Sequence, residues 1–163
     1  MDESLQKVDH SALKVNQALI IAISILAFVI NAAWLAAFVA LVMLLGTIFG
    51  KPGFYLVYKY VLRPAGLVKP DILMDNPEPH RFAQGFGGLV LAAGSLSLFL
   101  GAPVLGWALV WLVVALAALN LFAGFCMGCA MYYWLARMQA PGFSKTPPPD
   151  TFPGMRPKAR TIQ

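Results

Sequence analysis

The chain has 163 residues, of which 60% are hydrophobic and only 12% are charged, and its formal net charge is +5. A water-soluble domain carries about a quarter charged residues, so this composition excludes an ordinary soluble protein and favours one that is solvated by lipid. Nucleic-acid binding is excluded as well, because the basic residues stand at the ends of apolar runs and do not cluster with interleaved aromatic residues.

All charged residues fall in three segments, at 1–17, 51–81 and 137–163, and the two runs between them, 18–50 and 82–136, carry none. Each run is longer than the about 20 residues that cross the core of a bilayer. Each is therefore expected to fold back on itself. Helices are expected rather than barrel strands, because lipid offers no partner for open backbone groups and the runs show no polar alternation.

The first apolar run is expected to form two helices, over about 11–30 and 33–50. As one helix it would measure about 50 Å, against a core of about 30 Å. Asn31 near its middle favours a turn. Ser11 is the expected N-cap. The acidic start lacks the basic region and cleavage site of a signal peptide, so this run is expected to stay in the mature protein.

The central segment divides into two parts. Residues 54–63 are aromatic and basic, which predicts a short helix in the headgroup layer. Residues 67–80 contain three prolines and are expected to be irregular. His80 ends this segment, and Arg81 and Gln84 come directly after it, where the next helix begins. These three polar side chains are expected at the membrane interface.

The second apolar run is interrupted by Gly101-Ala102-Pro103, which predicts helices over about 82–100 and 104–135. The tail, residues 141–163, is rich in proline and is expected to be extended and unpacked. If such a tail is ordered, a docking protein is the simplest cause. A protein partner that contacts the tail and the central loop is therefore expected.

The predicted fold class is all-α. It is a polytopic membrane domain (residues 1–140) of four transmembrane helices in two hairpins, with a short interfacial helix and the Pro-rich tail. Four spans gather all charged segments on one face, and the positive-inside rule makes that face cytoplasmic. Three spans are the alternative, because that rule is also satisfied when the N-terminus lies outside.

Cys126 and Cys129 are the main candidates for chemistry. Within a helix over 104–135 they would share a face about 5–6 Å apart, which is within disulfide range and near the cytoplasmic interface. A redox pair that serves a soluble thiol protein is one interpretation. Its weakness is that the pair would lie late in the helix, where the dipole opposes a thiolate. Packing is the second interpretation, since Gly124 and Gly128 form a Gly-x-x-x-Gly pattern.

Metal binding is the third interpretation. A site of both cysteines with His10 and His80 is conceivable, but the spacing matches no familiar zinc finger, so the histidines are interpreted as interfacial polar residues. No metal and no other cofactor is expected. Asn120 is expected to join helices through its amide. No acidic residue falls within a span, which leaves a proton relay without a carrier.

Two strings, Arg81-Phe82-Ala83-Gln84 and Gly124-Phe125-Cys126-Met127-Gly128-Cys129, carry a family resemblance. Over about residues 15–138 the chain resembles the bacterial membrane family named domain of unknown function 4395. The resemblance implies a four-helix membrane domain with paired cysteines on the last helix. It also implies thiol or sulfur handling with a thioredoxin-like or sulfurtransferase-like protein. Together with the positive-inside rule, a bacterial family places the chain in the bacterial inner membrane with both termini in the cytoplasm.

Two functional hypotheses follow. The first is a thiol–disulfide or sulfur relay at the paired cysteines. The alternative is a non-catalytic accessory subunit of a larger respiratory or photosynthetic electron-transfer complex, motivated by the small-residue faces and the scarcity of catalytic polar groups. A transporter is less favoured, because neither charges nor broken helices mark a substrate path.

Overall fold

The computed structural model of the protein describes residues 5–157. In chain order the elements are β1 (Gln6–Asp9), α1 (His10–Val29), α2 (Ala33–Ile48), α3 (Tyr55–Val57), a π-helical turn η1 (Tyr58–Leu62), β2 (Ile72–Asp75), α4 (Pro77–Phe99), α5 (Pro103–Ala123) and α6 (Met127–Arg137). Strands β1 and β2 pair antiparallel, with Gln6 opposite Asp75 and Asp9 opposite Ile72. The predominantly helical fold agrees with the prediction.

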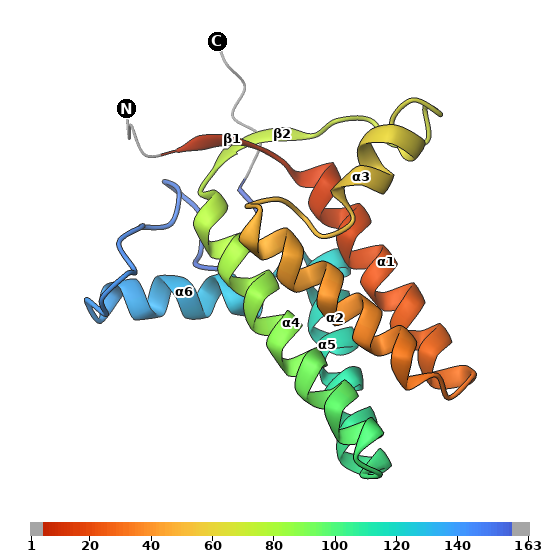
Figure 1. Cartoon of the computed structure of the whole chain (residues 1–163). Coiled ribbons are helices and arrows are strands. Elements are labelled where there is room, and N and C mark those ends of the chain that lie inside the picture. The colour runs from red at the N-terminus through yellow and green to blue at the C-terminus, as the bar shows by residue number, and fades with distance from the viewer. Residues whose placement is uncertain (1–4, 158–163) are drawn as a thin grey trace.

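The four long helices form one bundle in which α1 packs on α2, α2 on α4, α4 on α5, and α5 on α1. Figure 1 shows the β1–β2 pair and α3 at one end of this bundle, and the α1–α2 and α4–α5 turns at the other. Helix α6 packs on α4 and runs across the bundle rather than along it. The described parts of the charged segments therefore gather at the end that carries the strands.

Three helices, α1, α4 and α5, are long and apolar enough to cross a membrane. Helix α2 is apolar too, but it has only 16 residues. That length corresponds to about 24 Å, which is less than the about 30 Å of a bilayer core. The described residues thus contain three helices that could span a membrane and one shorter apolar helix.

Two of the predicted helix breaks are present. Asn31 adopts a left-handed conformation, with φ at 51°, between α1 and α2. Gly101 has φ at 80° and precedes the Pro103 that begins α5. The predicted cap of α1 is wrong by two residues, since Asp9 is the N-cap and its carboxylate accepts the N–H of Ser11 at 3.0 Å. The Ser11 hydroxyl donates to the Lys69 carbonyl instead.

The third long helix begins earlier than predicted. Helix α4 starts at Pro77, within the segment expected to be irregular. Proline in the first turn does not interrupt a helix, because the N–H that it lacks has no partner there. The same segment also contains β2. Three prolines thus mark an ordered junction of strand and helix rather than a loop.

The predicted helix over 104–135 is wrong. Helix α5 ends at Ala123, and Gly124 follows with φ at 65°, the left-handed conformation that glycine commonly takes just past a helix end. Helix α6 begins only at Met127. The two cysteines therefore lie at the start of a helix, not near the end of one.

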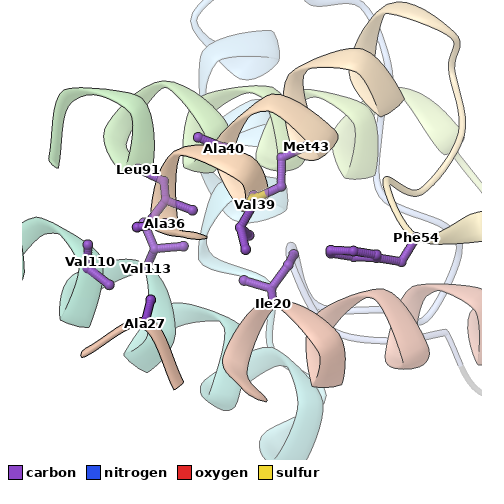
Figure 2. Close-up of a cluster of buried hydrophobic side chains, with 10 residues drawn as sticks. All are labelled: Ile20, Ala27, Ala36, Val39, Ala40, Met43, Phe54, Leu91, Val110 and Val113. Atoms are coloured by element: carbon purple, nitrogen blue, oxygen red, sulfur yellow. The ribbon is translucent and has the colours of Figure 1, made fainter. Parts of the chain in front are cut away.

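The core of the bundle is apolar and built largely from small side chains. Figure 2 shows its ten buried members, which come from all four long helices and the segment before α3: Ile20, Ala27, Ala36, Val39, Ala40, Met43, Phe54, Leu91, Val110 and Val113. Glycine lets α4 and α5 approach, since a Cβ on Gly94 would lie 3.1 Å from the Gly106 carbonyl oxygen. Large apolar side chains such as Leu100, Val104 and Phe122 face outward, as expected of a surface in contact with lipid.

Candidate functional site

The cysteine pair occupies the N-terminus of α6. Cys126 is the N-cap residue, and its sulfur accepts the backbone N–H of Cys129 at 3.2 Å. The two side chains form a disulfide, with their Cα atoms 5.2 Å apart. The expectation that the helix dipole opposes a thiolate here is therefore wrong. The positive end of the α6 dipole and an N–H group both point at Cys126, and such an environment stabilises a thiolate.

The two glycines around the cysteines have different surroundings. Gly124 forms the left-handed turn that separates α5 from α6. Gly128 lies in the first turn of α6 against α4, where a Cβ would be 2.6 Å from the Cβ of Ala83. Since they belong to different elements, they do not form a Gly-x-x-x-Gly face on one helix. Asn120 lies in the last turn of α5, where its carbonyl accepts the Gly124 N–H at 3.1 Å.

Part of the tail covers the cysteine pair. We call residues 151–157 the strap. Met155 forms an antiparallel bridge with Phe125, the Cys126 N–H donates to the Gly154 carbonyl at 2.7 Å, and the Arg156 N–H donates to the Gly124 carbonyl at 3.1 Å. The Arg156 side chain pairs with Asp71. The expectation of an unpacked tail is thus wrong for the strap, because the non-helical residues before α6 offer backbone groups that it satisfies. Residues 158–163 lie outside the described part of the chain.

A histidine and an aspartate stand behind the disulfide. His80 Nδ1 lies 3.4 Å from Cys129 Sγ, and His80 Nε2 lies 2.9 Å from Asp75 Oδ2. Asp75 is 3% exposed, and its other oxygen accepts the Asn76 N–H at 2.8 Å. Burial alone would raise the pKa of Asp75, but the adjacent imidazoles of His10 and His80 and the hydrogen bond from the Asn76 N–H outweigh it and hold the pKa well below its usual range. Asp75 is therefore an anion that orients His80.

His10 reaches the same carboxylate from α1. Its Nε2 lies 3.1 Å from Asp75 Oδ2 but off the direction of a hydrogen bond, so this buried nitrogen has no hydrogen-bond partner in the described structure. The His10 and His80 rings meet edge to face, with centroids 5.6 Å apart. The sequence favours interfacial positions for the two histidines and groups them with the cysteines only in the less favoured zinc-site interpretation, and it gives no signal for Asp75 between them.

These groups line one cleft of about 330 Å³, which Lys14, Asn120 and Arg156 also border. Tyr133 closes one side of it, and burial raises the pKa of this phenol to about 12, so it is neutral at physiological pH. A second cavity, of about 130 Å³, reaches Cys126 from within the bundle. The disulfide is thus bordered by space on two sides.

The two remaining predicted residues tie elements together beside the site. Arg81 Nε donates to the Thr47 carbonyl at 2.6 Å, at the C-terminal end of α2. Gln84 accepts the Gly53 N–H at 3.1 Å and donates to the Met43 carbonyl at 3.0 Å. They hold α4 against the end of α2 and the following loop, and neither contributes to the cysteine and histidine cluster.

Comparison with known proteins gives one match. No curated protein and no solved structure is detectably similar to the chain. A family model described as Domain of unknown function (DUF4395) matches residues 8–137, a range that includes His10, Asp75, His80 and both cysteines and ends before the strap. Because the match covers most of the chain, the protein belongs to this family of unknown function.

Proposed function

We propose that the protein is a membrane-bound thiol–disulfide relay in which Cys126 and Cys129 alternate between a disulfide and a dithiol. One observation carries the proposal: the pair forms a disulfide at a helix N-terminus and contacts His80, which Asp75 orients. Catalytic cysteines act as thiolates, and this position favours the thiolate of Cys126. If the two cysteines served only to pack helices together, no imidazole and carboxylate would be needed next to their sulfur atoms.

Reduction of the disulfide proceeds in two exchanges. A thiolate of a soluble dithiol protein attacks Cys126 Sγ, the bond to Cys129 breaks, and the electron pair leaves on Cys129 Sγ. The imidazolium form of His80 carries a proton on both ring nitrogens, and its Nδ1–H, 3.4 Å from Cys129 Sγ, is positioned to pass to that sulfur, which leaves a neutral imidazole with its Nε2–H on Asp75. The second thiolate of the partner then attacks the mixed disulfide and releases Cys126. The partner leaves as a disulfide, and the pair has gained two electrons and, once both sulfurs are protonated, two protons.

The reverse direction uses the same groups. When Cys129 attacks a mixed disulfide on Cys126, His80 Nδ1 accepts the thiol proton, because the Nε2–H is engaged by Asp75. Cys126 is thus the exchanging sulfur, Cys129 the resolving sulfur, and Asp75 a positioning residue. The partner in this proposal is a soluble thioredoxin-like or sulfurtransferase-like protein.

The placement in the membrane is part of the proposal. We place α1, α2, α4 and α5 across the bacterial inner membrane, with α2 as the fourth and shortest span. The strand-bearing end of the bundle holds the described charged segments, and the positive-inside rule favours the cytoplasm for that end. Soluble cytosolic thiol proteins would then meet the disulfide at the membrane surface.

The accessory-subunit alternative has less support. Besides the small-residue faces and the scarcity of catalytic polar groups, an ordered tail held by a larger complex would favour it, but the strap makes its contacts with Phe125, Cys126 and Asp71 of the same chain. An external partner is therefore not needed to explain the order of the strap.

A trapping experiment tests the relay. The full-length protein in lipid nanodiscs is incubated with a soluble CxxC protein that retains only its attacking cysteine. We expect a mixed disulfide that mass spectrometry locates on Cys126, and we expect none in Cys126→Ser. The matched variant Cys129→Ser, oxidised beforehand with a small disulfide, should accept the same partner. Failure of the partner and of small thiols alike to open the wild-type disulfide would refute the relay, and a persulfide on Cys126 after incubation with a sulfur donor would identify sulfur as the cargo.

A further inference from the structure

Three metal-ligating side chains from separate elements converge in the cleft. His10 is the first residue of α1, Asp75 the last residue of β2, and His80 lies in the first turn of α4. We propose that these three residues bind a divalent transition-metal ion of the zinc class. The site is distinct from the disulfide and does not depend on the proposed relay.

The spacing of the three ligand atoms suits such an ion. Asp75 Oδ2 lies 3.1 Å from His10 Nε2 and 2.9 Å from His80 Nε2, and all three atoms lie within 4.8 Å of one another. Around a tetrahedral zinc ion with bonds of about 2.0–2.1 Å, ligand atoms stand about 3.3 Å apart. Small movements of the side chains are therefore enough to admit the ion.

His10 supplies the independent observation. It is only 5% exposed, and its Nε2 has no hydrogen-bond partner although it points toward the cluster. Buried polar atoms are almost always satisfied, and one that is not calls for an explanation. A bound ion would use the lone pair of this nitrogen, and Asp75 would neutralise part of its charge.

The surroundings complete a coordination site. Asp75 Oδ1 is held by the Asn76 N–H, which leaves Oδ2 for the ion, and His80 Nδ1 faces Cys129 Sγ, which fixes the ring. Such outer contacts orient metal ligands in proteins generally. Two histidines and one carboxylate leave a fourth position for water or another ligand. That position opens onto the cleft, which also gives the ion an entry path.

A second ligand set shares His80. His80, Cys126 and Cys129 also bring their ligand atoms within 4.8 Å of one another. This set requires free thiolates, so it is available only when the disulfide is reduced. The carboxylate set is available in the disulfide form, and the oxidation state of the cysteines therefore separates the two sites experimentally.

Cobalt titration of the full-length protein tests the proposal. The protein is kept in lipid nanodiscs, its disulfide is verified by alkylation and mass spectrometry, and metal is removed with a chelator before Co²⁺ is added. We expect one Co²⁺ per chain, with visible d–d bands but no sulfur-to-cobalt charge-transfer band, and we expect Zn²⁺ to displace it. The Cys126→Ser/Cys129→Ser double variant should still bind one Co²⁺ per chain with the same d–d bands, because neither cysteine is a ligand of this site.

Variants within the cluster sharpen the test. His10→Ala and Asp75→Asn should each weaken Co²⁺ binding by more than about tenfold, because changes even outside the ligand shell cost about that much. Asp71→Asn is the matched control, since this carboxylate pairs with Arg156 outside the cluster. If a variant fails to fold, the stoichiometry and spectrum of the wild type decide alone.

Three results would overturn the proposal: no binding to the oxidised protein, binding that appears only after reduction with a charge-transfer band, or full binding by folded His10→Ala. None of them bears on trapping at Cys126, so failure of the metal site and failure of the relay are distinguishable.

Discussion

Replacing Gly154 by alanine should loosen the strap from Cys126. Gly154 has φ at 84°, and a Cβ there would lie 2.7 Å from the Cys126 carbonyl oxygen and 2.8 Å from the Cβ of Ala130. A left-handed alanine costs about 1–2 kcal/mol. Forcing a methyl group into a packed contact costs about 1–3 kcal/mol more.

Gly142→Ala is the matched control. Gly142 lies in the same tail with φ at 89°, and a Cβ there would meet nothing within 4 Å. The control therefore carries the backbone cost without the steric one. The difference of about 1–3 kcal/mol corresponds to about 5-fold to 150-fold in the population of chains whose strap has left Cys126.

The assay is the rate at which dithiothreitol reduces the disulfide in nanodiscs, followed by alkylation and gel shift. If the strap limits access, Gly154→Ala should be reduced at least about five times faster than Gly142→Ala, because the open population rises by at least that factor. Equal rates in the two variants, or no change from the wild type in Gly154→Ala, would refute the idea that the strap shields Cys126.

Further predictions concern packing, topology and pH. Gly128→Ala should destabilise the fold by about 1–3 kcal/mol in thermal unfolding, because its Cβ would lie 2.6 Å from the Cβ of Ala83 and 2.8 Å from its Cα. Adding Ala83→Gly should restore only part of the loss, since the contact with the Cα remains. In a background without native cysteines, a cysteine at Gly101 should react with an impermeant maleimide from the side opposite to one at Arg63, and labelling from one side would contradict four spans. Because the pKa of Asp75 is lower in the folded than in the unfolded chain, its stabilisation should be fully present above about pH 4, the ordinary pKa of an aspartate, and should be lost progressively as the pH falls from there toward the depressed pKa of the folded state. Asp75→Asn in chelator should flatten this acid limb of the unfolding curve, and an unchanged limb would contradict the assignment.

The sequence predicts much of the bundle because the relevant signals are local. Absence of charge over two long runs requires lipid or burial, and Asn31 and Gly101 each break a helix through their own backbone preference. The start of α4 was predicted five residues too late, although Pro77 follows Asn76 in the order typical of a helix N-terminus.

The break at Gly124 was ambiguous from sequence. A glycine in an apolar run either packs against a neighbouring helix or ends its own, and the Gly-x-x-x-Gly spacing favoured the first choice. The structure takes the second, with φ at 65°. That single backbone angle changes Cys126 from a mid-helix residue to an N-cap and so decides the chemistry of the pair.

The rest of the site depends on contacts between distant segments. His10 and Asp75 meet because β1 pairs with β2, and the strap reaches Cys126 through backbone hydrogen bonds. Strands of four residues and a Pro-rich tail leave no periodic pattern that would reveal such pairings. From the sequence alone, Asp75 is therefore one of several charged residues in the central segment. Only the pairing of β1 with β2 shows that it lies beside His10.

The central claim, that Cys126 and Cys129 are a reversible redox couple, is tested most directly by redox equilibration. Membranes that contain the full-length protein are incubated in buffers of graded dithiol-to-disulfide ratio, quenched with acid, and alkylated before and after reduction so that mass spectrometry reports the state of each cysteine. The relay predicts that both cysteines convert together, as a single two-electron couple. Cysteines that stay reduced in every buffer, or a disulfide that persists in all of them, would contradict it.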